Sequence, residues 1–299
     1  MAQEWQHLWL DVPRANVEAV EDALMAAGAL SVTLEELGDE PVLEPRPGES
    51  PLWAETRVVG LFEGSVSPAT IVSTLHGLLR PALLDRLGHS VFDEDDWVRR
   101  TQADFEAMPI GERLVIVPAW DESETPAGLL PIRLDPGLAF GTGKHETTRL
   151  CLEWLESQGI EGEHWLDAGC GSGILAIAAL CLGAGHVDGT DIDPQALTAS
   201  RGNAELNDIA PARFSLHLAE EYPDDRRVDG LLANILAPTL IELAPVLGRH
   251  LKPGARFALS GILTHQADAV AAAWQAAGCR VDTFRELGDW ALVAGHRPA

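Results

Sequence analysis

Hydrophobic and polar positions follow two different patterns along this chain, and the first ends near residue 92. Up to that residue, strand-like alternation and helical spacing succeed one another in the order strand, helix, strand, strand, helix, strand. This order is typical of a ferredoxin-like fold, so we expect a small α+β domain over residues 1–92. The predicted strands are 5–12, 30–37, 56–62 and 88–92, and the predicted helices are 16–27 and 68–84.

The second pattern begins near residue 146, where apolar strands and amphipathic helices alternate strictly. Repeated strand–helix–strand units predict an α/β fold with a doubly wound parallel sheet, which binds ligands at the carboxyl ends of its strands. The predicted strands are 164–168, 186–191, 213–218, 228–234 and 255–260, the helices are 147–158, 174–182, 194–206, 238–250 and 265–277, and a final hairpin spans 280–287 and 290–296.

A short connecting region separates the two patterns. An acidic turn at residues 93–96 precedes a helical pattern at 97–108, and strand-like residues follow at 110–120, before a polar loop at 121–128. We therefore expect a linker helix over 93–108 and a second domain over 109–299.

The composition limits the partners and the compartment. The formal net charge of −25 repels phosphate backbones and attracts basic partners, although solubility alone also explains such a charge. No run approaches the ~18–20 apolar residues of a membrane span, and no signal-peptide pattern opens the chain. We expect no stable nucleic-acid binding, no membrane association and a cytoplasmic location. Four cysteines without zinc-ligand spacing predict free thiols: Cys151, Cys170, Cys181 and Cys279.

A glycine-rich turn is the sharpest local signal. Residues 167–173 (DAGCGSG) follow a strand and open a helix, so that their backbone can approach a ligand closely. The spacing G-x-G-x-G of Gly169, Gly171 and Gly173 differs from the dinucleotide fingerprint G-x-G-x-x-G. The compact form fits a ligand that carries an amino-acid carboxylate and a nucleoside without a pyrophosphate. A purely structural turn is the alternative, which we disfavour because three alternate glycines destabilise the chain.

Two further polar side chains stand at predicted strand ends. Asp191, about twenty residues after the glycines, can accept hydrogen bonds from both ribose hydroxyls. Asp193, directly before Pro194, is better explained as a helix N-cap. Asn234 emerges at the same edge of the sheet and can accept from a substrate amine or the cofactor, or else serve as a turn residue.

The segment 134–148 (LDPGLAFGTGKHETT) is a glycine-rich loop that runs into a helix. Such a loop can close over a ligand and offer hydroxyl and N–H groups. Within it, His145 is either a loop histidine bonded to the backbone or a catalytic base. We favour the loop histidine, because no acid partner can be assigned to His145 from the sequence.

Together these motifs resemble the bacterial ribosomal protein L11 methyltransferase family. The similar segments are the loop 134–148, the glycine turn 167–180 (DAGCGSGILAIAAL), 191–196 (DIDPQA), 233–237 (ANILA) and the N-terminal stretch 44–53 (EPRPGESPLW). The resemblance implies a Rossmann-like, seven-stranded class I methyltransferase domain, which is preceded in the sequence by a ferredoxin-like domain that recognises the substrate. It implies S-adenosyl-L-methionine as cofactor, and trimethylation of lysine side chains and of the N-terminal α-amine on a basic large-subunit ribosomal protein.

The resemblance also suggests individual site residues. We assign cofactor contacts to Phe140, Gly141, Thr148, Gly169, Gly171, Gly173, Asp191 and Asn234. Either Glu220 or Glu221 contacts the adenine, and the two are equally placed. Asn234 and His145 are the candidate catalytic residues, as walls of the amine site. Trp290 is either a cation–π partner of the methylated amine or a hairpin tryptophan.

Methyl transfer from a sulfonium to an amine needs no metal, so we expect none, and we expect a monomer. Three other functions share part of this pattern: an NAD-dependent oxidoreductase, a nucleic-acid methyltransferase and a non-catalytic ribosome-binding module. The glycine spacing opposes the first, the acidic charge opposes the second, and the intact set of cofactor motifs opposes the third.

Overall fold

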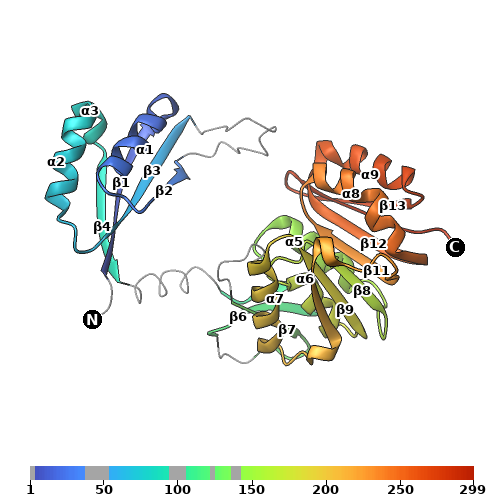
Figure 1. Cartoon of the computed structure of the whole chain (residues 1–299). Coiled ribbons are helices and arrows are strands. Elements are labelled where there is room, and N and C mark those ends of the chain that lie inside the picture. Colours follow the sequence, from blue (N-terminus) through green and yellow to red (C-terminus); the bar gives the residue numbers. More distant parts are fainter. Residues whose placement is uncertain (1–3, 38–53, 94–105, 122–124, 136–142) are drawn as a thin grey trace. The chain divides into compact units, whose positions relative to one another are not determined.

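The computed structural model describes residues 4–37, 54–93, 106–121, 125–135 and 143–299 (Figure 1). Its contacts divide the chain into two compact units, Met1–Asp104 and Phe105–Ala299. The division falls inside the predicted linker 93–108. Most of the predicted linker helix lies outside the described residues, and its last residue, Met108, begins a strand instead.

The N-terminal unit is a four-stranded antiparallel sheet with helices on one face, and its sheet order β2-β3-β1-β4 is that of a ferredoxin-like fold. Alternate residues of β1 are buried, Leu8, Leu10 and Val12 among them, and pack on the helices. The fold predicted for this region is therefore confirmed. Its elements are β1 (Glu4–Pro13), η1 (Arg14–Asn16), α1 (Val17–Ala26), β2 (Ser31–Glu36), β3 (Glu55–Glu63), α2 (Pro68–Leu78), α3 (Pro81–Leu84) and β4 (Leu87–Asp93).

The single helix predicted over 68–84 is wrong in one respect, because the structure has two helices there. Leu79 and Arg80 adopt extended backbone angles, with ψ of 154° and 140°. The ring of Pro81 disfavours helical geometry in the residue before it, so α2 ends and a short second helix begins at the proline.

The C-terminal unit contains a seven-stranded sheet of order β10-β9-β8-β11-β12-β14-β13, in which β14 runs antiparallel to the other six strands. The predicted doubly wound sheet is confirmed. The elements are β5 (Met108–Ile110), β6 (Leu114–Pro118), β7 (Leu130–Leu134), α5 (Glu146–Glu156), β8 (His164–Ala168), α6 (Ile174–Cys181), β9 (His186–Asp191), α7 (Pro194–Leu206), η2 (Pro211–Arg213), β10 (Phe214–Leu218), η3 (Ala219–Glu221), β11 (Val228–Asn234), α8 (Ala237–His250), β12 (Leu251–Leu263), η4 (Thr264–Gln266), α9 (Ala267–Ala276), β13 (Arg280–Leu287) and β14 (Trp290–His296).

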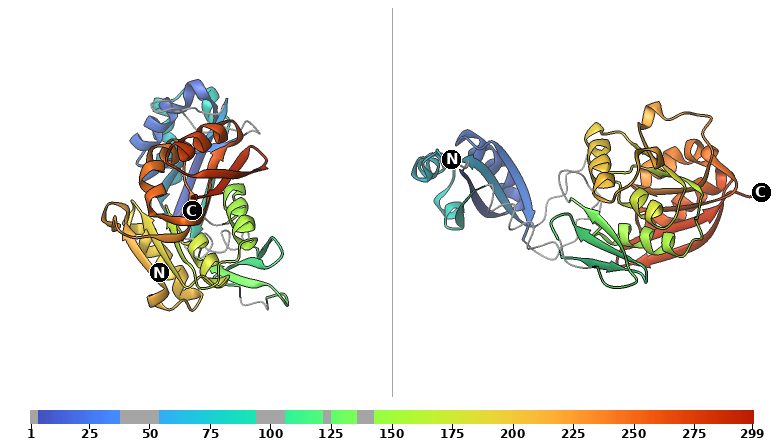
Figure 2. Two further views of the ribbon diagram at one scale, coloured as in Figure 1. Left: turned by 90° about the vertical axis from the view of Figure 1, so that its right-hand side faces the viewer. Right: turned by 90° about the horizontal axis from the view of Figure 1, so that it is seen from below.

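Helices cover both faces of this sheet (Figure 2). One apolar core contains residues of α5 and α6, and α6 is buried along nearly its whole length. The other core contains residues of α8 and α9, including the fully buried Trp274. Because both faces are buried, residues 230–233 of β11 are a continuous buried run without a charged side chain.

A separate three-stranded sheet, β5-β6-β7, was only partly foreseen. The sequence pattern predicted strands at 110–120 but assigned Leu134 to a glycine-rich loop, whereas β7 ends at that residue and pairs parallel to β6. Gly111, with a φ of +57°, makes the turn between β5 and β6. Ile132 of β7 is fully buried in the core shared with α5 and α6.

The strand register brings three motifs to one edge of the large sheet. Ala168 pairs with Thr190 on one side and with Ala233 on the other. Gly169, Asp191 and Asn234 therefore emerge side by side at the carboxyl ends of β8, β9 and β11, as the sequence predicted. Among the described residues, no helix is long and apolar enough to cross a membrane.

Candidate active site

A cavity of about 630 Å³ opens at this carboxyl edge. Its volume falls within the range of about 300–1,000 Å³ that is usual for small-molecule sites. The lining combines a few polar groups with many apolar side chains, and its polar members include His145, Thr147, Thr148, Thr190, Asp191, Glu220, Tyr222, Asp224, Asn234, Thr239 and His250. Thus Thr148, Gly169, Gly171, Asp191, Asn234 and His145, all predicted site residues, share one cavity.

The glycine turn shapes one wall of the cavity. Gly169, Gly171 and Gly173 have φ values of +76°, +53° and +80°, which other residues rarely adopt. A Cβ on Gly169 would lie 2.3 Å from Ile235 Cγ2, and one on Gly173 would lie 2.9 Å from Ser200 Oγ. Gly173 is not among the residues that line the cavity. Gly169 and Gly173 are therefore required for two reasons: the positive φ of the turn, and the close packing of Ile235 and Ser200 against it.

Asp191 fixes the middle of the turn. Its Oδ2 accepts a hydrogen bond from the amide of Gly171 at 2.9 Å, and its Oδ1 accepts one from the amide of Asp193 at 3.0 Å. Each carboxylate oxygen has a second lone pair, so Asp191 can still accept hydrogen bonds from a ligand. Asp193 caps α7 by accepting from Gln195 N at 2.8 Å, which confirms its predicted role as an N-cap.

Asp167, one strand position before the turn, is fully buried. Its Oδ2 accepts from the amide of Ala176 at 3.0 Å, and its Oδ1 has no hydrogen-bond partner in the described structure. Burial raises the pKa of this carboxyl group to about 7, because desolvation outweighs the one hydrogen bond and the nearby charge of Asp191 adds to the rise.

Asn234 and Thr148 meet across the floor of the cavity. The Asn234 amide nitrogen donates to Thr148 Oγ1 at 3.2 Å, which links β11 to the first turn of α5. Thr148 is fully buried. With its nitrogen engaged in this way, the carbonyl oxygen of Asn234 is the end of the amide that accepts hydrogen bonds.

His145 is the N-cap of α5. Its Nδ1 accepts from the amide of Thr147 at 3.3 Å and lies 2.8 Å from the Thr147 hydroxyl oxygen. Its ring also meets Trp290 edge-on, with 4.6 Å between ring centroids. The favoured prediction for His145, a loop histidine bonded to the backbone, describes this geometry. The nearest described carboxylate, Glu146, lies 3.9 Å from Nδ1 and is exposed.

The two acids that the sequence proposed for the adenine, Glu220 and Glu221, lie in η3 directly after β10. Glu220 lines the cavity and Glu221 does not. Sequence reasoning missed Tyr222 and the apolar wall of α8 (Leu243, Val246 and Leu247), which also line it. Only the helical spacing of α8 hinted at this wall. Two other predicted contacts, Phe140 and Gly141, lie outside the described residues.

The cavity fits a ligand with an amino-acid part and a nucleoside part. The glycine turn offers backbone amides, Asp191 offers acceptors for vicinal hydroxyls, and apolar side chains of α8 offer a surface for a flat ring. With the strand order and the single antiparallel strand β14, these features define a class I methyltransferase domain.

Comparisons with known proteins support the assignment to the methyltransferases. A family model described as ribosomal protein L11 methyltransferase matches residues 4–298. Ribosomal protein L11 methyltransferases of Chromohalobacter salexigens and Azotobacter vinelandii are 44% and 46% identical to this chain, over 99% and 98% of it and 99% of each relative. A crystal structure of ribosomal protein L11 methylase from Lactobacillus delbrueckii subsp. bulgaricus is 35% identical and superposes with a TM-score of 0.60, covering 65% of this chain and all of that one.

The chain belongs to the ribosomal protein L11 methyltransferase family. The predicted enzyme class, an S-adenosylmethionine-dependent methyltransferase, is confirmed, and the alternative of an NAD-dependent oxidoreductase is excluded.

Proposed function

We propose that this enzyme trimethylates lysine side chains and the N-terminal α-amine of ribosomal protein L11. This is the protein after which its relatives are named. The observation that carries the proposal is the shared cavity, which is lined both by residues for the cofactor (Gly169, Gly171 and Asp191) and by residues for the amine (Asn234, His145 and Trp290).

Different residues of the cavity would hold different parts of the cofactor. The backbone of Gly169 and Gly171 would border the amino-acid part, Asp191 would accept from the ribose hydroxyls, and Glu220 would accept from the adenine amine. Asn234 and Thr148 close the site at the reacting end. When bound, S-adenosylmethionine supplies an activated methyl group on a sulfonium, so the protein has no group to activate there.

The acceptor amine must be neutral, because its lone pair attacks the methyl carbon. At pH 7 the deprotonation of a lysine with a pKa of about 10.4 costs roughly 4.6 kcal/mol, whereas an α-amine at about 7.7–8 costs roughly 1 kcal/mol. The amine site offers an amide oxygen on Asn234 to hold an N–H, and the aromatic rings of Trp290 and His145 to exclude water. The enzyme therefore positions and desolvates the amine, and His145 supports the wall as a positioning residue.

The rest of the proposal concerns the partner. The net charge of −25 suits a basic ribosomal protein and opposes stable nucleic-acid binding. The ferredoxin-like unit is the part not needed for cofactor binding, so we assign it to substrate recognition. We expect the enzyme to act as a monomer in the cytoplasm.

The test is intact mass spectrometry of purified ribosomal protein L11 after incubation with enzyme and cofactor. The proposal predicts added masses in steps of one methyl group, with three steps on each modified amine. Asp191→Ala should abolish the mass increase, whereas the matched control Asp193→Ala, which loses only a helix cap outside the cavity, should preserve it. An unchanged substrate mass with the wild-type enzyme, or modification at a side chain without an amine, would refute the proposal.

A further inference from the structure

A cluster of histidine and aspartate side chains lies away from the methyl-transfer cavity, at the amino-terminal ends of the parallel strands. His164 is the first residue of β8, and His186 and Asp188 are the first and third residues of β9. His186 and Asp188 are two positions apart on one strand and share one face of the sheet. The pairing of His164 with His186 brings the third side chain beside them.

The possible ligand atoms of the three residues converge. His164 Nε2 lies 2.9 Å from Asp188 Oδ2, and His186 Nε2 lies 3.0 Å from Asp188 Oδ1. All three ligand atoms lie within 4.8 Å of one another. The ligand atoms of a tetrahedral zinc ion with bonds of about 2.0–2.1 Å lie roughly 3.3 Å apart, so only small side-chain movements are needed to match that geometry.

The tautomer of His186 is set by its second nitrogen. Nδ1 lies 3.0 Å from the carbonyl oxygen of Ala212, which can only accept, so Nδ1 carries the proton. In a neutral ring, Nε2 then presents a lone pair to the Asp188 oxygen. The hydroxyl of Ser215, 3.1 Å from Nε2, can donate to that lone pair. A metal ion, or a second proton on the ring, would join Nε2 to the Asp188 oxygen at 3.0 Å.

The surroundings resemble those of a metal site. Histidine ligands usually donate their other N–H to a backbone carbonyl, as His186 does, and ligating carboxylates are themselves hydrogen-bonded. Asp188 is fully buried and accepts from the hydroxyl of Tyr222 at 2.9 Å. Its two oxygens each face a different imidazole, so two ring nitrogens and one carboxylate converge on a single point of the structure.

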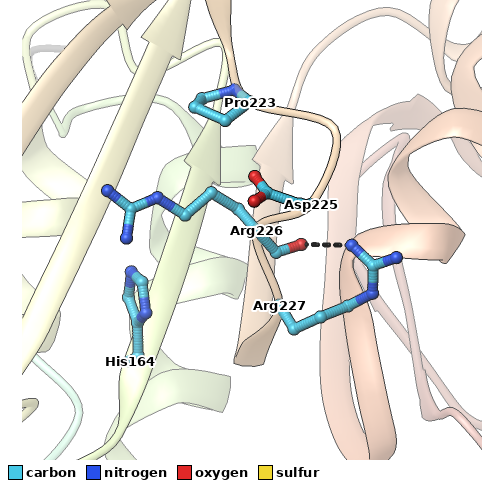
Figure 3. A pocket seen from close by; sticks show the side chains of 5 residues that line it. All are labelled: His164, Pro223, Asp225, Arg226 and Arg227. Atoms are coloured by element: carbon cyan, nitrogen blue, oxygen red, sulfur yellow. Dashed lines mark hydrogen bonds between the residues drawn. The ribbon is translucent and has the colours of Figure 1, made fainter.

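The site is accessible from outside. The side chains of His164 and His186 are 22% and 29% exposed. A second cavity, of about 430 Å³, borders His164, and Figure 3 shows the Arg226 side chain reaching toward that ring.

We propose that His164, His186 and Asp188 form a binding site for a divalent transition-metal ion of the zinc type. Two imidazole nitrogens and one carboxylate are the donors that such ions prefer, whereas magnesium and calcium prefer oxygen ligands. The site lies at the opposite edge of the sheet from the methyl-transfer cavity, so its role is to hold β8 and β9 together, and methyl transfer does not pass through it.

The test uses the full chain, treated with a chelator and then titrated with Zn²⁺ by calorimetry. We expect one zinc ion per chain and a thermal unfolding midpoint that rises with zinc concentration. His164→Ala and His186→Ala should each weaken zinc binding by about tenfold or more. His296→Ala is the matched control, because His296 also pairs with an aspartate, Asp282, in this sheet but has no second histidine there.

Controls keep the test decisive if the alanine variants fold poorly. His186→Gln retains a polar side chain of similar size, and binding of S-adenosylhomocysteine reports whether the domain is folded. Absence of zinc binding by the wild type would overturn the proposal, as would zinc binding that persists in folded His164→Ala and His186→Ala or Gln variants. Nitrogen NMR that shows both ring nitrogens of His186 protonated at pH 7, with no response to zinc, would overturn it in favour of a proton.

Discussion

Two aspartates on the single strand β9 serve opposite edges of the large sheet, and they are held by different kinds of donor. Asp191, at the carboxyl end, accepts from two backbone amides, those of Gly171 and Asp193. Asp188, near the amino end, faces two histidine side chains and the hydroxyl of Tyr222. The carboxyl edge thus presents a rigid backbone site to a ligand, whereas the amino edge joins neighbouring strands through side chains.

Asp167, a third aspartate that is buried like Asp188, has fewer hydrogen-bond donors than Asp188, and the pKa values of the two differ in direction. Burial alone would raise the pKa of Asp188, but its bonds to His164, Tyr222 and His186 hold that pKa well below the usual range. Asp167 is equally buried but has one backbone donor, and its pKa is raised to about 7. Both carboxyl groups are desolvated, so the hydrogen bonds and charges around each one decide whether its pKa falls or rises.

The largest effect is expected at Asp191. Asp191→Ala removes the acceptor of two backbone amides and of the proposed ribose hydroxyls, so we expect S-adenosylhomocysteine affinity to fall about 100-fold or more, from charge-assisted hydrogen bonds of roughly 1.5–3 kcal/mol each. Calorimetry measures the change, with Asp193→Ala as control. A folded Asp191→Ala protein that binds within about threefold of the wild type, a gap of roughly 0.6 kcal/mol, would remove the distinction between the two edges.

At the other end of β9, Asp188→Asn should act on stability. The variant keeps the shape of the side chain but weakens its bonds to His164, His186 and Tyr222, so we expect the free energy of unfolding to fall by about 2 kcal/mol. Denaturant unfolding in the presence of a chelator measures this without a metal contribution. A variant as stable as the wild type would show that the amino edge does not hold the strands together.

Asp167 should make stability depend on pH in the opposite sense from an ordinary carboxylate. Its folded pKa of about 7 exceeds the ordinary value of 3.8, so its contribution to stability is present at low pH and is lost as pH rises to 7. The unfolding free energy of Asp167→Asn minus that of the wild type should therefore increase between pH 4 and 7, by up to about 1.4 kcal/mol per pH unit. Parallel pH profiles for the two proteins would show that Asp167 is ionised in the fold.

The contrast between the two edges also explains how far the sequence could predict the molecule. Strands 164–168, 186–191 and 228–234 were predicted with the observed bounds, because each alternates with a helix and ends at an aspartate or asparagine or directly before a glycine. The carboxyl edge was predictable because the three glycines and Asp191 act through backbone geometry, which is local in sequence. Sequence motifs therefore identified five of the cavity's polar residues that the structure describes: His145, Thr148, Asp191, Glu220 and Asn234.

The missed features depend on contacts between distant segments. The pairing of β7 with β6 joins residues 130–134 to 114–118, and no local pattern announced it. Tyr222 lines the cavity only because the chain after β10 turns back toward β9 and α8. The cluster of His164, His186 and Asp188 needs the register between two strands, since H-x-D on one strand carries no signal by itself.

The central claim is that the carboxyl-edge cavity selects and positions a neutral amine and that no enzyme base takes its proton. Single-turnover methylation of ribosomal protein L11 variants that carry one acceptor each, from pH 6 to 10, tests it most directly. The rate for the α-amine should level off near pH 8, while the rate for a lysine should keep rising, by up to about tenfold per pH unit, until its shifted pKa is reached. The account would be contradicted if both acceptors followed one ionisation near pH 6.5 that His145→Ala abolishes.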